Sequence, residues 1–214
     1  MKKLVLSATL LLMGAFKVAA QEVTPQLTAF PEFRPATVYM ADGKKMNIPM
    51  ANIFLKNSSL LYLSGELTKE ANTKNLLRVD FEDRSYIRID SVLAYQIDTV
   101  GSNALYCAKV LDLKAYKQTL MNNSNITNLD LNSLTSMNMF QFSTIDLEDT
   151  KDIHFPVIPL YYYKLNNKFV LVHERHLKRA LDKESRRRME SVMNLQGFSW
   201  TDEKFLLKIL EVIQ

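Results

Sequence analysis

The sequence predicts an α+β fold: a mainly antiparallel β-sheet with a short middle helix and two C-terminal helices. Apolar and polar residues alternate with period two between residues 77 and 98, as half-buried antiparallel strands require. Asp42-Gly43 and Asn166-Asn167 each separate two apolar runs, and both pairs favour hairpin turns. Beyond residue 172 this alternation ends, and apolar residues recur at helical spacing.

The first strands are expected between residues 37 and 63. In TVYMADGKKMNI, Asp42-Gly43 predicts a hairpin because the turn needs positive φ, which glycine adopts at little cost. NIFL and SLLYLSG predict two further strands near residues 52–63. Before them, three prolines make residues 21–36 an extended lead-in rather than a helix. Residues 37–214 are therefore predicted to form a single α+β domain.

The clearest strands lie in the segment LLRVDFEDRSYIRIDSVLAYQID. Leu77, Val79 and Phe81 alternate with Arg78 and Asp80, and the same pattern continues to residue 98. The apolar residues are predicted to face the core. The charged residues are interpreted as a solvated sheet face rather than as a binding surface.

A further strand and a short helix precede a polar segment. ALYCAKVL predicts a strand, and it contains the chain's single cysteine, Cys107. A lone cysteine is either a small buried hydrophobe or a reactive thiol, and the apolar neighbours favour burial. In DLKAYKQTLM, Asp112 is a candidate N-cap for the middle helix. Residues 122–138 are rich in Asn, Ser and Thr, which favour turns, so a polar loop is expected there.

The C-terminal part is expected to form a hairpin and two helices. In the strand before Asn166-Asn167, the rings of residues 161–163 alternate between two faces, which indicates strand packing rather than a ligand platform. Residues 172–192 predict one charged surface helix, with three acid–base pairs in favourable i, i+4 order. The last helix is expected to be capped by Thr201 and to pack an apolar stripe on the sheet. The three pairs are Glu174 with Lys178, Asp182 with Arg186 and Glu184 with Arg188, and the stripe is Phe205, Leu206, Ile209, Leu210 and Ile213.

The charged helix holds the candidate binding residues, which are His173, His176, Arg186, Arg187 and Arg188. The histidines are three apart, whereas a zinc-binding helix of the H-E-x-x-H type places them four apart. No metal and no cofactor are therefore predicted. Successive helical residues are about 100° apart, so the three arginines spread over about 200° and do not form one patch. A surface helix is the favoured interpretation, with an anion-binding role for the arginines as the alternative.

The N-terminal segment MKKLVLSATLLLMGAFKVAAQ is typical of a secretory signal peptide. Residues 1–20 are predicted to be removed after Ala20, which gives a periplasmic or secreted protein. No later segment approaches the roughly 18 apolar residues of a membrane span. The leader holds three of the 27 basic residues and none of the 23 acidic residues, so the remaining chain is nearly neutral. A nucleic-acid partner is not expected, because such proteins usually show a clear basic excess.

The layout of the chain resembles a loose class of small exported proteins from Gram-negative Bacteroidota. The shared features are a signal peptide, a strand-rich front with an ADGKK turn, and a closing hairpin followed by two charged helices. The resemblance covers the whole chain and contains no diagnostic motif. It implies an envelope or secreted location, and it transfers no activity and no catalytic residue.

The motifs G-x-S-x-G, H-E-x-x-H, G-x-G-x-x-G and the Walker loop do not occur in the sequence, which leaves open whether the protein is an enzyme. The leading hypothesis is a non-enzymatic exported protein that binds a partner protein or an envelope component. One alternative is a small hydrolase that uses Cys107 or carboxylates such as Glu82 and Asp83. Another is a carrier that holds an apolar ligand in a curved sheet. A closed core, a polar cleft or a large apolar cavity would distinguish the three, and the sequence sets no oligomeric state.

Overall fold

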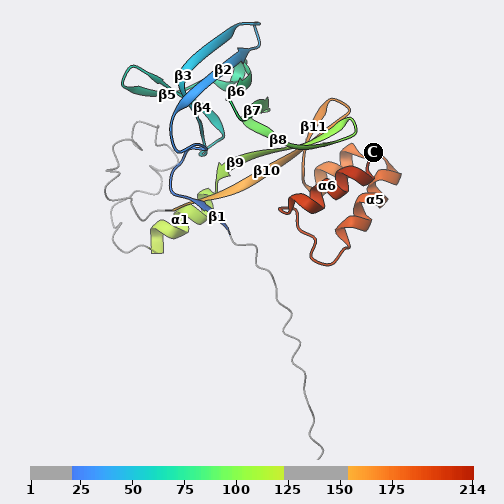
Figure 1. Cartoon of the computed structure of the whole chain (residues 1–214). Helices are drawn as coiled ribbons and strands as arrows, with labels where there is room; N and C mark the ends of the chain where they lie inside the picture. The colour runs from blue at the N-terminus through green and yellow to red at the C-terminus, as the bar shows by residue number, and fades with distance from the viewer. Residues whose placement is uncertain (1–20, 123–153) are drawn as a thin grey trace, which may run out of the picture.

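The computed structural model describes residues 21–122 and 154–214, coloured from blue to red along the chain in Figure 1. The strands in these ranges are β1 (Glu22–Thr24), β2 (Arg34–Met40), β3 (Lys45–Phe54), β4 (Ser59–Ser64), β5 (Leu67–Glu70), β6 (Leu76–Asp80), β7 (Ser85–Ile89), β8 (Val92–Val100), β9 (Asn103–Leu111), β10 (Phe155–Leu165) and β11 (Lys168–Leu171). They form one 11-stranded sheet in the order β1-β10-β9-β8-β7-β6-β2-β3-β4-β5, with β11 paired to β10. All the pairings are antiparallel, so the predicted α+β class with a mainly antiparallel sheet is confirmed.

The helices of the described residues lie after β9 and after β11. They are α1 (Leu113–Asn122), α4 (Glu174–Ala180), α5 (Lys183–Met193) and α6 (Glu203–Val212), and a 3-10 turn, η1 (Thr73–Asn75), precedes β6. Asp112 caps α1 as predicted, because its carboxylate accepts the N–H groups of Lys114 and Ala115 at 3.1 and 3.0 Å. None of these helices combines the length and the apolarity needed to cross a membrane.

The prediction of one helix over residues 172–192 is wrong, because this segment forms α4 and α5. Leu181 ends α4 in an extended conformation, with ψ at 150°. Asp182 then begins α5, and its carboxylate accepts the N–H groups of Glu184 and Ser185 at 2.8 and 2.9 Å. An acid that satisfies the free donors of a first turn starts a new helix readily. The break places Leu177 of α4 and Met189 of α5 in the same core, and both are fully buried.

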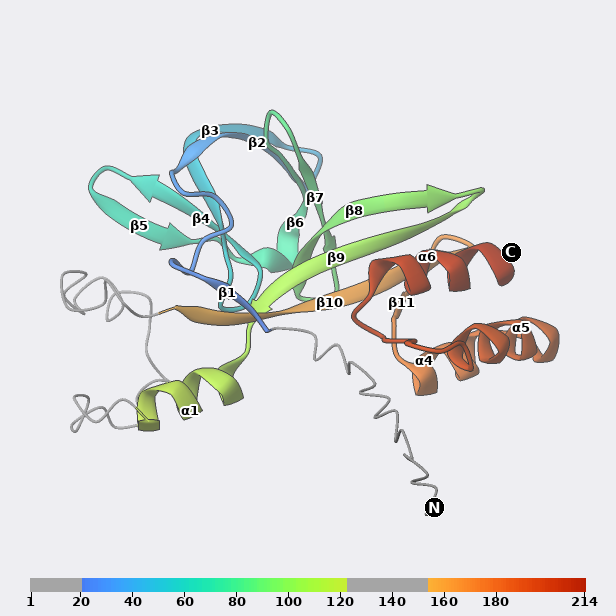
Figure 2. The ribbon, with the colours of Figure 1, turned by 60° about the horizontal axis from the view of Figure 1, so that its bottom comes forward.

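The front of the sheet, strands β2 to β6, curls upon itself, as Figure 2 shows. Ser58, in the β3–β4 turn, closes the curl against β8. The N–H of Leu93 donates to the Ser58 carbonyl at 2.8 Å, and the Ser58 hydroxyl donates to the Leu93 carbonyl at 2.6 Å. The inner face of this curled sheet holds a core that includes Val38, Ile53, Leu60, Leu76, Val79, Phe81 and Tyr86.

The long strands β8, β9 and β10 form the other half of the sheet, and helices α4, α5 and α6 cover one of its faces (Figure 2). Tyr161 and Tyr163 point into this helical core, whereas Tyr162 packs on the opposite face, so the predicted strand packing of these rings is confirmed. The α6 stripe packs on the sheet as predicted, and the Tyr163 hydroxyl donates to the Leu206 carbonyl at 2.6 Å. The cap of α6 is Asp202, whose carboxylate accepts the Lys204 N–H at 2.9 Å, and not Thr201.

Two strand predictions need correction. In β6 the buried residue is Leu76, whereas Leu77 is 48% exposed. The pairing of β2 with β6 shifts by one residue between Tyr39 and Met40, and this bulge turns Leu77 away from the core. NIFL is the end of β3 and not a separate strand.

The segment 21–36, predicted as an extended lead-in, contains β1 and the beginning of β2. The predicted signal peptide, residues 1–20, and most of the predicted Asn-rich loop at 122–138 lie outside the described residues.

Candidate functional site

The two histidines of the charged segment lie at the start of α4, and both are exposed. His173 is the N-cap of α4, and its Nδ1 accepts the Arg175 N–H at 3.3 Å. The rings of His173 and His176 meet edge to face, with centroids 5.9 Å apart. Within residues 21–122 and 154–214, no three His, Cys, Asp or Glu side chains gather as a metal-binding set. The structure therefore gives His173 a helix-capping contact and His176 a ring contact.

The three arginines of α5 do not share a partner. Arg186 Nε donates to the Leu181 carbonyl at 2.8 Å, and Arg188 contacts the Ser185 hydroxyl at 3.3 Å and the Gln214 carbonyl at 3.4 Å. Arg187 is exposed. The three arginines thus do not form a shared anion-binding site.

Of the predicted i, i+4 pairs in this segment, Glu174 with Lys178 forms at 2.7 Å, and Glu184 with Arg188 is long at 3.8 Å. The predicted pair of Asp182 with Arg186 is replaced by the cap of α5, since the Asp182 carboxylate is bound by the first turn of that helix.

Cys107 lies in the helical core of the sheet and is fully buried, as predicted. Burial raises the pKa of its thiol to about 11, although a hydrogen bond with Tyr95 opposes the rise. A nucleophilic cysteine needs the opposite, an accessible thiol with a lowered pKa.

Of the acids named for a hydrolase, Asp83 is paired with Arg34, and Glu82 is exposed in the β6–β7 turn. Cys107 is thus a core residue, whereas Glu82 and Asp83 belong to a surface turn.

A hollow with an apolar floor and a polar rim lies in the curled front of the sheet, at the end formed by the β2–β3 hairpin and the link from β5 to β6. We call this hollow the groove, and it has a volume of about 540 Å³. Its floor is lined by Val38, Met40, Met46, Ile48, Leu60 and Leu76. Its rim includes Asn47, Tyr62, Ser64, Glu70, Asn72 and Asn75. Sequence reasoning did not identify this site.

The groove forms because residues 71–75, which return from β5 to β6, are tied to β4 and to the β2–β3 turn. The Ala71 N–H donates to the Leu60 carbonyl at 2.8 Å, and the Ala41 N–H donates to the Asn75 carbonyl at 2.7 Å. Val38, Leu60 and Leu76 are each 1% exposed, so the floor is the upper layer of a packed core. One signal in the sequence was the methionine content of YMADGKKMNIPM, since unbranched thioether side chains are common at adaptable binding surfaces.

The polar groups of the rim are held by local hydrogen bonds. Asn72 accepts the Lys74 N–H at 3.0 Å and caps η1. The Glu70 carboxylate accepts from the Asn57 amide at 2.7 Å. Because these groups are fixed before any ligand arrives, the rim is preorganised.

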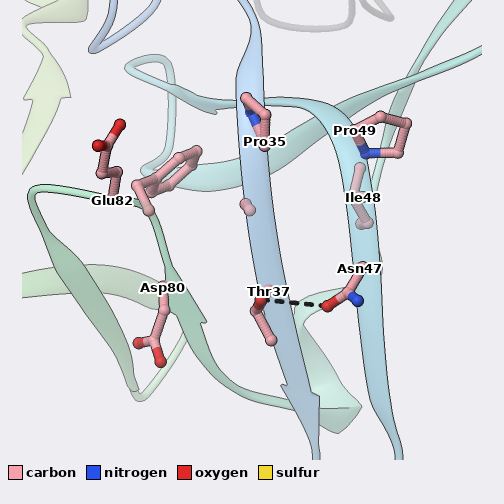
Figure 3. Close-up of a pocket in the computed structure, with 9 residues that line it drawn as sticks. Pro35, Thr37, Asn47, Ile48, Pro49, Asp80 and Glu82 are labelled. Carbon is pink, nitrogen blue, oxygen red and sulfur yellow. Dashed lines mark hydrogen bonds between the residues drawn. The ribbon is translucent and has the colours of Figure 1, made fainter.

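A second hollow, of about 510 Å³, is lined by β2, β3 and residues 80–82, and Figure 3 shows its residues. Pro35 and Pro49 flank it where the β2–β3 register shifts, since a proline lacks the N–H that a ladder requires. The Thr37 hydroxyl donates to the Asn47 side-chain oxygen at 3.2 Å, the dashed line in Figure 3. Oδ2 of Asp80 accepts from Arg78 at 2.9 Å. Two carboxylates, Asp80 and Glu82, line this hollow, which makes it more acidic than the groove.

Comparisons of the chain with protein-family models, with curated proteins and with solved structures found no match. No activity, ligand or residue role is therefore carried over from another protein. The resemblance to exported Bacteroidota proteins stays a prediction, and the function is inferred from the geometry of this chain.

Proposed function

We propose that the protein is an exported binding protein that holds a small apolar ligand in the groove. The observation that carries the proposal is the groove itself, an apolar floor with a polar rim around a volume of about 540 Å³. Small-molecule sites typically have volumes of about 300–1,000 Å³, apolar linings and a few fixed polar groups. Of the hypotheses drawn from the sequence, this geometry supports the carrier of an apolar ligand best.

The floor supports binding without a large rearrangement. Val38, Leu60 and Leu76 are held from below by the core of the curled sheet. In contrast, Met46 is 43% exposed, and a bound ligand would cover it. A preformed floor lowers the entropy lost on binding, and flexible methionines allow ligands of different shape.

The driving force is the removal of apolar surface from water. Each buried methylene contributes about 0.8 kcal/mol, so eight of them contribute about 6 kcal/mol. The freedom that the ligand loses on binding offsets part of this gain, so the value is an upper bound on the apolar contribution. A fluorescent probe measures the affinity directly.

Export is the second part of the proposal, and it rests on the leader sequence. Two lysines, an apolar run and small residues before Gln21 are typical of a secretory signal. A protein partner that binds the α5 arginines together has less support, because Arg186 and Arg188 each bond to a different group of this chain.

The test uses the neutral apolar fluorophore N-phenyl-1-naphthylamine, which brightens when it leaves water. Met46 and Met50 form a matched pair for this test, because both lie in β3 and are 43% and 40% exposed, but only Met46 lines the groove. We expect Met46→Glu to weaken probe binding about tenfold or more, since it places a charge on an apolar surface. Met50→Glu should bind the probe as the unmodified protein does.

Two outcomes would contradict the proposal. One is that the unmodified protein does not bind the probe. The other is that Met46→Glu and Met50→Glu weaken binding equally, which would place the probe outside the groove. Because both side chains are exposed, neither variant should lose its fold, and circular dichroism of each variant checks this.

A further inference from the structure

Lys69 does not line the groove itself, but it lies beside two residues that do, Tyr62 and Ser64. It is the cross-strand partner of Tyr62 in the pairing of β4 with β5. Cross-strand partners share one face of a sheet, and Tyr62 lines the groove, so Lys69 lies on the groove side of β5. Its ammonium donates to the hydroxyl of the rim residue Ser64 at 3.1 Å.

Among the described residues, no carboxylate forms an ion pair with the Lys69 ammonium at 4.0 Å or less. Lys44 is paired with Asp42 and Arg78 with Asp80, each at 2.9 Å, whereas the Lys69 ammonium donates to a neutral hydroxyl. An ammonium has three donors, so two of them remain for a ligand after the bond to Ser64.

One acid, Glu70, also lines the groove and would oppose an anion there. Its carboxylate is bound by the Asn57 amide at 2.7 Å, and its strand partner is Leu61, on the other face from Tyr62. Residues 38–76, from the first to the last residue that lines the groove, include five basic and three acidic residues. This small basic excess favours an anionic ligand.

We propose that the ligand is a single-chain amphiphile whose apolar body covers the floor of the groove and whose carboxylate binds the Lys69 ammonium beside the rim. This inference rests on the proposed function and adds the chemistry of the ligand's head group. The Ser64 hydroxyl holds the ammonium in place. An ion pair at this exposed position adds at most a several-fold preference for the carboxylate, since exposed pairs contribute about 0–1 kcal/mol.

The experiment compares two ligands that differ only in their head groups. Decanoate and decan-1-ol are titrated as competitors of N-phenyl-1-naphthylamine on three proteins: the unmodified chain, Lys69→Gln and Lys168→Gln. Lys168 lies in β11, away from the groove, and its substitution removes the same charge (Figure 1). We expect Lys69→Gln to lower the affinity for decanoate about fivefold and to change the affinity for decan-1-ol less than twofold. Lys168→Gln should change neither ligand.

Ionic strength gives an independent test. Salt should weaken the binding of decanoate to the unmodified protein and have little effect on the binding of decan-1-ol. Equal losses of both ligands in Lys69→Gln, or no loss of either, would overturn the head-group inference while leaving the groove as a binding site. Failure of both ligands to displace the fluorophore, or failure of the fluorophore to bind, would overturn the proposed function and this inference with it.

Discussion

Ile209 is the residue whose substitution tests the architecture most directly. It lies in α6, is 0% exposed and belongs to the core between the helices and strands β8 to β10. In Ile209→Ala the helix keeps a good helix former, so the loss reports packing rather than helix propensity. The substitution removes three carbon atoms from a site enclosed by Leu206, Leu210 and Tyr163, among others.

The expected loss follows from the buried atoms. At about 0.8 kcal/mol for each buried carbon group, transfer alone contributes about 2.4 kcal/mol. The remaining cavity adds to this, and substitutions of this kind cost about 2–5 kcal/mol in total. We therefore expect Ile209→Ala to lower the free energy of unfolding by about 3–4 kcal/mol. For a protein of this size, that corresponds to a fall in Tm of about 10 °C.

Thermal and urea unfolding measure this loss, and two spectroscopic probes follow the helical core and the strands. The fluorescence of Trp200, the chain's only tryptophan, follows the helical core against which it packs, and circular dichroism follows the strands. Arg187→Glu is the control, since exposed substitutions usually change stability by about 0.5 kcal/mol or less. The reasoning is refuted if Ile209→Ala unfolds at the same temperature and urea concentration as the unmodified protein. It is also refuted if Arg187→Glu loses as much stability as Ile209→Ala.

Two further predictions concern the thiol and the leader. Cys107 should react slowly with a thiol reagent in the native protein at pH 9 and rapidly in denaturant, because burial holds its pKa at about 11; rapid native labelling would contradict the buried position. Since the folded chain keeps this proton more tightly than the unfolded chain, the thiol should make stability fall as pH rises from about 9 towards about 11. Protein recovered from the periplasm or the medium should begin at Gln21, and an intact Met1 there would contradict export by cleavage.

The elements that the sequence predicted well are those that depend on neighbouring residues. The hairpin at Asp42-Gly43 forms with Gly43 at φ 83°, and the hairpin at Asn166-Asn167 forms with φ of 49° and 63°. The apolar stripe of α6 is buried because helical spacing alone places its residues on one side. These features follow from local backbone preference and periodicity, and each can be recognised within about ten residues.

The break between α4 and α5 depends on the local Asp182 cap and on tertiary packing, and the bulge in β6 depends on strand register. Leu181, where the backbone is extended, is buried in the helical core. In β6, periodicity favoured Leu77 as a core residue, but the register of β2 against β6 placed Leu76 there instead. A shift of one residue changes the face of a strand, and the sequence of one strand does not contain its register.

The groove depended on tertiary structure most of all. Its residues extend from Val38 to Leu76, and they meet because the strands curl and the Ser58–Leu93 contacts close the curl. The sequence by itself determined the strands, the turns and which helix face is apolar, since each is a property of a short segment. Only the folded chain decided where the apolar floor stays uncovered and that Lys69 lies beside it, because both depend on the pairing of strands that are distant in the sequence.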